Sequence, residues 1–297
     1  MILDCNMEAG TLQGPVKGAI RTPEGRNLMV LFPCYKQTNA MTAWALQAIA
    51  IDLGKERVRF SQELGNAMIY QARNKLAHDF IETGAEWSLW IDDDVVPPVG
   101  RAEWFKRIGN LPPEYPDKAA GLHVVDRLLS HKKKIIGGVY FGRQRTGPPM
   151  FAEMANPEAV AECRSFKDGI RATDWVATGC LLVHRDVYLD IRKAFPELAP
   201  EQAGTKKVWK MRWGDKAGKW TEANTGGKPE VFEKEEWVAG TKWWDYFKPE
   251  TGKGEDVMFS YRARMAGHQV YVDTMCHSLH VGYNTFHALN TTGGTKG

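Results

Sequence analysis

Residues 87–98 read Trp-Ser-Leu-Trp-Ile-Asp-Asp-Asp-Val-Val-Pro-Pro, an apolar run that ends in three consecutive carboxylates. The apolar part predicts a buried strand, and the two prolines end it. Alternate side chains of a strand share a face, so Asp92 and Asp94 are expected on one face and Asp93 on the other. Carboxylates held close together repel one another unless a cation lies between them. A solvated turn is the alternative, but the segments described below favour a functional site.

Strand and helix patterns alternate along the rest of the chain. The expected strands span residues 27–32, 57–60, 134–141, 173–184 and 270–272, and the expected helices span residues 41–53, 65–83, 104–108, 124–130, 185–195 and 257–265. Strands that alternate with helices are typical of a parallel sheet covered on both faces. The predicted class is therefore α/β, with a mixed, mostly parallel central sheet flanked by helices.

Composition limits the class of protein. The chain has 297 residues, of which 43% are hydrophobic, and its formal net charge is +3. A substantial core can form, and the charge is too balanced to indicate nucleic-acid binding unless it is clustered. The five cysteines are scattered and form no Cys-x-x-Cys pair, and no apolar run is long enough to cross a membrane. We therefore expect a cytoplasmic protein without a membrane span, and the oligomeric state stays open.

Residues 200–250 differ in composition from the rest and predict an insertion. Six Lys and Arg residues between positions 206 and 219 are interleaved with Trp209, Trp213 and Trp220. Such a segment could bind single-stranded nucleic acid or sugar rings. The alternative is a long hairpin whose Trp residues pack while its Lys residues stay in water. Residues 1–26 are expected to form an amino-terminal arm, and residues 283–297 a flexible tail.

A second polar cluster lies between Gly254 and Gly282. Glu255 and Asp256 precede the expected helix at 257–265, where acidic side chains also interact favourably with the helix dipole. His280 follows the expected strand at 270–272. A single histidine is usually a core or surface residue, so His280 gains interest only from its place after a strand.

These pieces together resemble the GT-A nucleotide-sugar glycosyltransferases, in particular the family-2-like group. The resemblance spans about residues 27–282, and it rests on the order of the pieces. They are Leu-Phe-Pro-Cys-Tyr at 31–35, Arg73-Asn74, Asp92-Asp93-Asp94 as an Asp-x-Asp motif, Thr178-Gly179, Gly254-Glu255-Asp256 and His280-x-Gly282. The basic Trp-rich insertion and the amino-terminal arm depart from the family pattern.

The resemblance implies a GT-A-like catalytic domain at residues 27–282 that is a metal-dependent glycosyltransferase. It would move a sugar from a nucleoside diphosphate sugar, a UDP-sugar being favoured, to an acceptor hydroxyl. A hard divalent cation, Mn²⁺ or Mg²⁺, would neutralise the diphosphate leaving group. Asp94 and His280 would bind this metal, and the nitrogen ligand suits Mn²⁺ better than Mg²⁺.

The resemblance also implies roles for the other residues. Asp256 would be the base that takes the acceptor proton in an inverting reaction, and Glu255 would orient the acceptor or hold the helix start. Inversion and retention both stay open. The nucleotide-binding residues would be Tyr35, Arg73, Asn74, Asp92 and Asp93. The acceptor side would be edged by Trp175, Thr178 and Gly179.

Other functions stay open on the sequence alone. The acceptor could be a glycan, a small molecule or a hydroxylated base in DNA, and the basic Trp-rich segment would suit the last. A nucleotidyltransferase would need a phosphate loop after the first strand, and residues 33–39 lack the Gly-rich, basic pattern of one. A non-catalytic glycan- or nucleic-acid-binding protein on the same scaffold is disfavoured by the joint presence of Asp94, Asp256 and His280.

Overall fold

The computed structural model describes residues 28–54, 57–66, 68–142, 150–151, 162–200, 206–212, 231–237, 243–282 and 285–286. The chain divides into two compact units, one of residues 1–194 and 246–297 and the other of Phe195–Asp245. The expected arm at residues 1–26 lies outside the described residues, as do residues 283–284 and 287–297 of the expected tail.

A seven-stranded sheet forms the centre of the larger unit, among the residues that the structure describes. In spatial order its strands are β2 (Val58–Leu64), β1 (Leu28–Cys34), β3 (Trp87–Ile91), β7 (Cys180–His184), β5 (Ile135–Val139), β10 (Val270–His277) and β6 (Ile170–Thr173). Five strands run in one direction, whereas β7 and β6 run antiparallel to their neighbours. The predicted α/β class with a mixed, mostly parallel sheet is confirmed.

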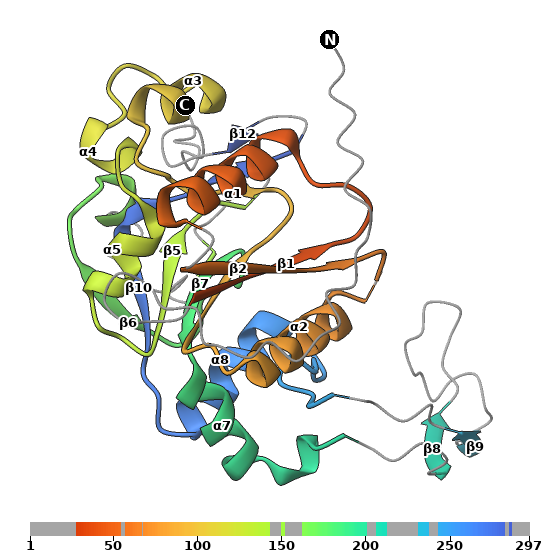
Figure 1. Cartoon of the computed structure of the whole chain (residues 1–297). Helices are drawn as coiled ribbons and strands as arrows, with labels where there is room; N and C mark the ends of the chain where they lie inside the picture. Colours follow the sequence, from red (N-terminus) through yellow and green to blue (C-terminus); the bar gives the residue numbers. More distant parts are fainter. Residues whose placement is uncertain are drawn as a thin grey trace, which may run out of the picture. The chain divides into compact units, whose positions relative to one another are not determined.

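Helices cover both faces of this sheet (Figure 1). In that view α1 (Ala40–Leu53), α3 (Ala102–Gly109), α4 (Asp117–Ala120) and α5 (Val124–Ser130) lie on the upper side, and α2 (Ile69–Thr83), α7 (Arg185–Ala194) and α8 (Glu255–Met265) lie below. A sheet covered on both faces needs strands that are apolar on both sides. Accordingly all five residues of β3 are buried.

Local sequence signals explain where the first two long helices begin and end. The Asn39 side chain accepts a hydrogen bond from the Met41 amide at 2.9 Å, which caps the start of α1. Gly84 ends α2 in the left-handed conformation, with φ of 74°, which costs glycine little. The face of α2 that packs on the sheet carries the buried apolar residues Ala72, Leu76, Ala77, Phe80 and Ile81.

A small second sheet joins the acidic segment to the end of the chain. Its spatial order is β12 (Thr285–Phe286), β11 (Leu279–Val281) and β4 (Val95–Val96). In the antiparallel register of β11 and β4, His280 lies opposite Val95. This pairing places His280 beside the residue that follows Asp94. Part of the expected tail therefore pairs as a strand.

The expected strand at residues 173–184 was correct only in its last part, because Thr173 ends β6 and β7 starts at Cys180. β6 ends at Thr173 and pairs antiparallel with β10 at the edge of the sheet, whereas β7 begins at Cys180 and lies between β3 and β5. A turn at Thr178-Gly179 precedes β7. Apolar content alone predicts extended chain and does not predict which strand it joins.

The smaller unit contains the basic Trp-rich segment. Within it β8 (Lys206–Arg212) pairs antiparallel with β9 (Val231–Trp237), so that Lys206 lies opposite Trp237. This backbone pairing agrees with the hairpin in the second alternative, and the packing of its Trp side chains stays a prediction. Residues Trp213 and Trp220 lie outside the described residues.

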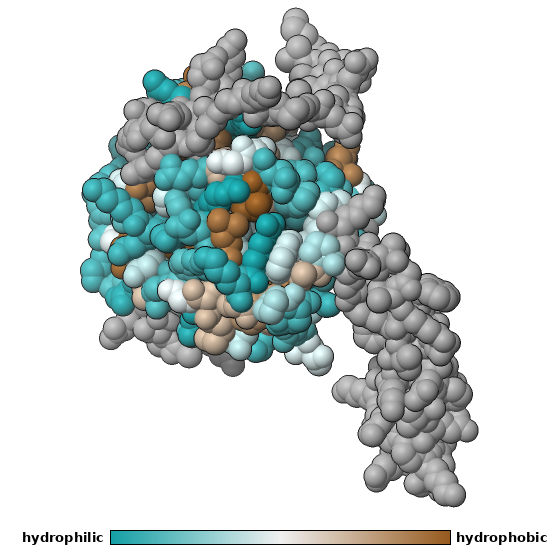
Figure 2. All heavy atoms as spheres, turned by 60° about the horizontal axis from the view of Figure 1, so that its bottom comes forward, coloured by the Kyte–Doolittle hydropathy of each residue, from teal (hydrophilic) through white to brown (hydrophobic). Residues whose placement is uncertain are grey.

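Three features of the described residues can be compared with expectations from composition: the surface, the helices and the cysteines. Figure 2 shows a mostly hydrophilic face with a small hydrophobic group near its centre. In the described ranges no helix combines the length and the apolar character that crossing a membrane requires. The four described cysteines, Cys34, Cys163, Cys180 and Cys276, are buried free thiols.

Candidate functional site

Five chain segments meet at one edge of the central sheet. The carboxyl ends of β1, β3, β5 and β10 lie there because these strands are parallel, and the amino end of β7 lies there because β7 is antiparallel. The segments after β3 and before β7 are in direct contact, because the Asp92 amide donates a hydrogen bond to the Gly179 carbonyl at 3.3 Å. This edge is where open α/β sheets commonly hold ligands.

The three aspartates after β3 form a tight turn, so the expectation that Asp92 and Asp94 share a strand face was wrong. β3 ends at Ile91, and the Val95 amide closes the turn on the Asp92 carbonyl at 3.1 Å. The turn sends the carboxylates to different partners: Asp92 contacts Arg73, and Asp94 approaches His280. An Asp93 oxygen accepts from the Tyr35 amide at 3.4 Å.

Arg73 is a buried cation shared by three carboxylates. Its Nη2 donates to both Asp92 oxygens at 2.9 and 3.0 Å. Its Nη1 lies 2.9 Å from Glu255 Oε1 and 2.6 Å from Asp256 Oδ1. The side chain is only 3% exposed, so the guanidinium ties α2, the acidic turn and the start of α8 together away from water. Burial lowers the pKa of Arg73, but the charges of Asp256, Asp92 and Glu255 raise it by more than burial lowers it. The pKa is therefore above its ordinary value, and the group stays protonated.

Asp256 has the chemistry of a base. Burial, opposed by the charge of Arg73 but reinforced by the charges of Glu255 and Asp92, raises its pKa to about 6. The buried Thr178 hydroxyl donates a hydrogen bond to Asp256 Oδ1. The Asp256 side chain is 20% exposed, so solvent reaches part of it. A carboxylate with this pKa accepts a proton more readily near neutral pH than an ordinary aspartate.

Asp94 and His280 form the second part of the site. His280 Nδ1 lies 2.8 Å from the Phe141 carbonyl oxygen, so the tautomer with the proton on Nδ1 donates to it. The Nε2 lone pair then faces Asp94 Oδ1 at 3.6 Å, which is too long for a hydrogen bond. The two side chains are 18% and 12% exposed, and both come from strand ends at the same edge.

Tyr140, directly after β5, is a site residue that the sequence reasoning missed. Its hydroxyl accepts from the Gly179 amide at 3.2 Å, and its ring meets the His280 ring edge-on at 5.2 Å between centroids. Burial, together with the charges of Asp92 and Asp256, raises its pKa well above the ordinary value, so the hydroxyl stays neutral. The predicted strand at residues 134–141 included Tyr140, whereas β5 ends at Val139, so a correct strand end would have placed Tyr140 in the loop where site residues were sought.

The other predicted residues take varied places. Tyr35 follows β1 with 51% of its surface exposed, as a ring that stacks on a ligand would need. Asn74 is buried, and its Oδ1 accepts from the Phe247 amide at 2.9 Å. That contact gives Asn74 a structural role. Trp175 is half-buried, and its carbonyl accepts from the Thr173 hydroxyl at 3.2 Å.

Comparisons with known proteins give no family. No protein-family model matches the chain, and no curated protein matches its sequence. Among solved structures, the chain is similar to A197 from STIV, with 10% identity, 86% of each chain covered and a TM-score of 0.44. It is also similar to a glycosyltransferase involved in the glycosylation of the major capsid of PBCV-1, with 15% identity, 58% of this chain and 66% of that chain covered, and a TM-score of 0.27. Similarities this low do not identify a function, which has to be argued from the site.

Proposed function

We propose that this protein is a metal-dependent glycosyltransferase that uses a nucleoside diphosphate sugar, with a UDP-sugar as the favoured donor. One observation carries the proposal: Asp94 and His280 meet at the same sheet edge as the cluster of Arg73, Asp92, Glu255 and Asp256. A candidate ligand pair beside a carboxylate of raised pKa is what metal-assisted transfer to a hydroxyl needs.

The donor atoms of Asp94 and His280 fit a divalent cation. Two atoms bound to one ion by bonds of about 2.1 Å stand about 3 to 4 Å apart, in keeping with their separation of 3.6 Å. The bond from His280 Nδ1 to a backbone carbonyl is the usual way in which a protein orients a ligating imidazole. Among the described residues, no three His, Cys, Asp and Glu side chains are grouped to hold a metal ion, so diphosphate oxygens and water would complete the shell.

The cation would act as a Lewis acid that stabilises the diphosphate leaving group. Asp256 would take the proton of the acceptor hydroxyl in an inverting reaction, helped by its raised pKa. Arg73 would hold Asp92, Glu255 and Asp256 in place. The prediction that Arg73 also contacts the nucleotide stays a prediction, because its guanidinium is already shared by these carboxylates.

The remaining residues divide between donor and acceptor. Tyr35, Asp93 and Asp92 lie on the loops after β1 and β3 and would contact the nucleotide. Thr178 and Gly179 precede β7 and would edge the acceptor, together with Trp175. The two sides meet where the Asp92 amide donates to the Gly179 carbonyl at 3.3 Å, so donor and acceptor would lie next to each other there.

The test is release of nucleoside diphosphate from a panel of nucleoside diphosphate sugars with Mn²⁺, Mg²⁺ or a chelator. We expect metal-dependent release, and a loss of about 100-fold or more in Asp94→Ala and His280→Ala. The matched control is His268→Ala, because His268 Nε2 also lies near a carboxylate, 3.0 Å from Asp190, but belongs to neither the site nor its edge. The control should keep its activity.

Three outcomes would overturn the proposal. One is nucleotide affinity that is equal with and without metal. Another is full activity in Asp94→Ala. The third is release of pyrophosphate in place of nucleoside diphosphate, which would make the protein a nucleotidyltransferase.

A further inference from the structure

Two tryptophans stack on the surface where α1 and α3 meet. The rings of Trp44 and Trp104 lie 4.0 Å apart between centroids, with an angle of 23° between their planes. Trp44 keeps 38% of its surface exposed, and Trp104 is half-buried. Large aromatic rings left at the surface often mark a place where a ligand packs.

This aromatic pair is held in position by ionic contacts. Arg101 lies over the Trp44 ring at 5.7 Å. Its guanidinium binds both oxygens of Asp52 on α1, at 2.6 and 2.7 Å, and the Val99 carbonyl at 2.9 Å. Because both Arg101 and Trp104 contact the Trp44 ring, the pair is arranged before any ligand arrives.

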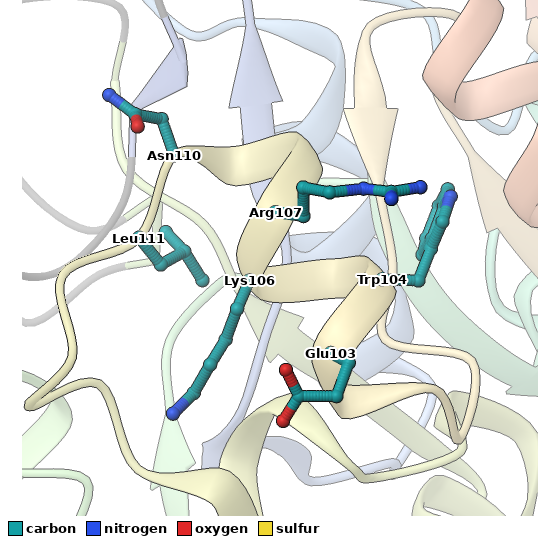
Figure 3. Close-up of a pocket in the computed structure, with 6 residues that line it drawn as sticks. All are labelled: Glu103, Trp104, Lys106, Arg107, Asn110 and Leu111. Atoms are coloured by element: carbon teal, nitrogen blue, oxygen red, sulfur yellow. The ribbon is translucent and has the colours of Figure 1, made fainter.

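A cavity of ≈ 660 Å³ lies against α3 next to this pair. It is lined by Glu103, Trp104, Lys106, Arg107, Asn110 and Leu111, so none of the site residues described above contributes to it. Figure 3 shows Arg107 extending from α3 toward the Trp104 ring, with Glu103 and Lys106 on the next side of the helix and Asn110 at its end. The volume is in the range of about 300 to 1,000 Å³ that small-molecule sites occupy.

We propose that this cavity binds a carbohydrate, with Trp104 as the stacking platform. A sugar ring has an apolar face that an indole covers, and its hydroxyls both donate and accept hydrogen bonds. The lining supplies both kinds of partner, because Arg107 donates, Glu103 accepts, and the Asn110 amide does both. A phosphate only accepts hydrogen bonds, and Glu103 would repel it. Lys106 is already neutralised by Asp117 at 2.5 Å, so the lining is not a cationic track for nucleic acid.

The cavity lies on the exposed face of α3, whereas the buried face of this helix packs toward the proposed transfer site. The helix follows β4, which directly follows the acidic turn. Its last residue, Gly109, packs so closely on Leu279 that an added Cβ would lie 2.9 Å from the Leu279 Cδ1 atom. Leu279 is the neighbour of His280.

The test is binding of the full chain to a panel of immobilised oligosaccharides of defined structure, followed by calorimetric titration of the tightest one. We expect Trp104→Ala and the exposed-residue variants Arg107→Gln and Glu103→Gln each to weaken binding by about tenfold or more. The control is Tyr261→Ala, since Tyr261 is an exposed aromatic under a cation, with Lys253 at 5.1 Å from its ring, but lies on α8. The control should bind as the wild type does.

The two proposals fail separately. Asp94→Ala should keep its oligosaccharide affinity even where it has lost diphosphate release, and a loss of both would remove the separate site. Absence of any binding oligosaccharide overturns the carbohydrate site, as does binding that Arg107→Gln and Glu103→Gln leave unchanged. Single-stranded oligothymidylate that binds in their place, with the same dependence on Arg107, would make the cavity a nucleic-acid site and overturn the inference.

Discussion

The Asp256→Asn variant should gain stability relative to the wild type as the pH rises from 4 to 8. Asp256 has a folded-state pKa of about 6, raised from the usual 3.8. A carboxyl group with a raised pKa contributes stability that is present below the unfolded pKa and is lost as the pH rises through the folded pKa. Above pH 6 the folded protein therefore carries an ionised carboxylate that it disfavours, and the asparagine variant lacks it.

The size of this effect follows from the two pKa values. At about 1.4 kcal/mol for each pH unit, the difference between 3.8 and about 6 amounts to about 3 kcal/mol. The side chain is 20% exposed, so solvent screening reduces this figure only modestly. The ion pair with Arg73 forms only as Asp256 ionises, and its favourable contribution is already included in the pKa of about 6. The quantity to measure is therefore how the difference in free energy of unfolding between the variant and the wild type changes with pH.

Urea unfolding followed by tryptophan fluorescence, at several pH values between 4 and 8 and at constant ionic strength, gives this quantity. The matched control is Asp186→Asn, because the hydrogen bond from Lys134 lowers the pKa of Asp186. The sign is then opposite: wild-type Asp186 contributes stability above its unfolded pKa and loses it as the pH falls. A difference between Asp256→Asn and wild type that stays constant from pH 4 to 8 would refute the raised pKa and remove the basis for Asp256 as the base.

Three further substitutions test the contacts that hold the site, each measured as the free energy of unfolding in urea at pH 7.5. Arg73→Met should cost about 3 to 5 kcal/mol because it leaves buried carboxylates without their cation, whereas Lys134→Met, which breaks a surface pair at 2.7 Å, should cost about 1 kcal/mol or less. Gly179→Ala should cost about 1 to 3 kcal/mol, since its Cβ would lie 2.6 Å from the Tyr140 hydroxyl oxygen. Asn74→Ala should cost about 1 to 3 kcal/mol because it leaves a buried backbone amide without an acceptor. Equal losses in Arg73→Met and Lys134→Met would contradict the buried-cluster interpretation.

Apolar periodicity predicted the sheet and most of its helices from local signals. The helix at residues 124–130 has the predicted bounds, and the strand at Trp87–Ile91 ends where the first aspartate begins. These elements are governed by residues close in sequence, such as an apolar run or a glycine at a helix end. A rule based on strand ends then placed Asp92 and His280 correctly at one edge of the sheet.

The sequence could not predict which residues pair across the chain. Arg73 and Asp256 are 183 residues apart, and no local pattern indicates that one guanidinium would serve three carboxylates. The turn at Asp92 to Asp94 replaced strand alternation because β3 ends at Ile91, before the first aspartate. Tyr140 was missed because it lay inside the strand predicted at residues 134–141, whereas β5 ends at Val139 and Tyr140 contacts Gly179 and His280.

The site has an excess of negative charge, which affects both the cluster around Arg73 and the Asp94–His280 pair. Arg73 offsets one of the three negative charges that Asp92, Glu255 and Asp256 carry together, and the adjacent turn adds Asp93 and Asp94. A nucleoside diphosphate brings further negative charge, so it would be repelled from this edge unless a divalent cation accompanied it. Burial, reinforced by the charges of Glu255 and Asp92, keeps the pKa of Asp256 high. One electrostatic feature would thus account for both a need for metal by the donor and a base for the acceptor, and it ties the two tests to the same residues.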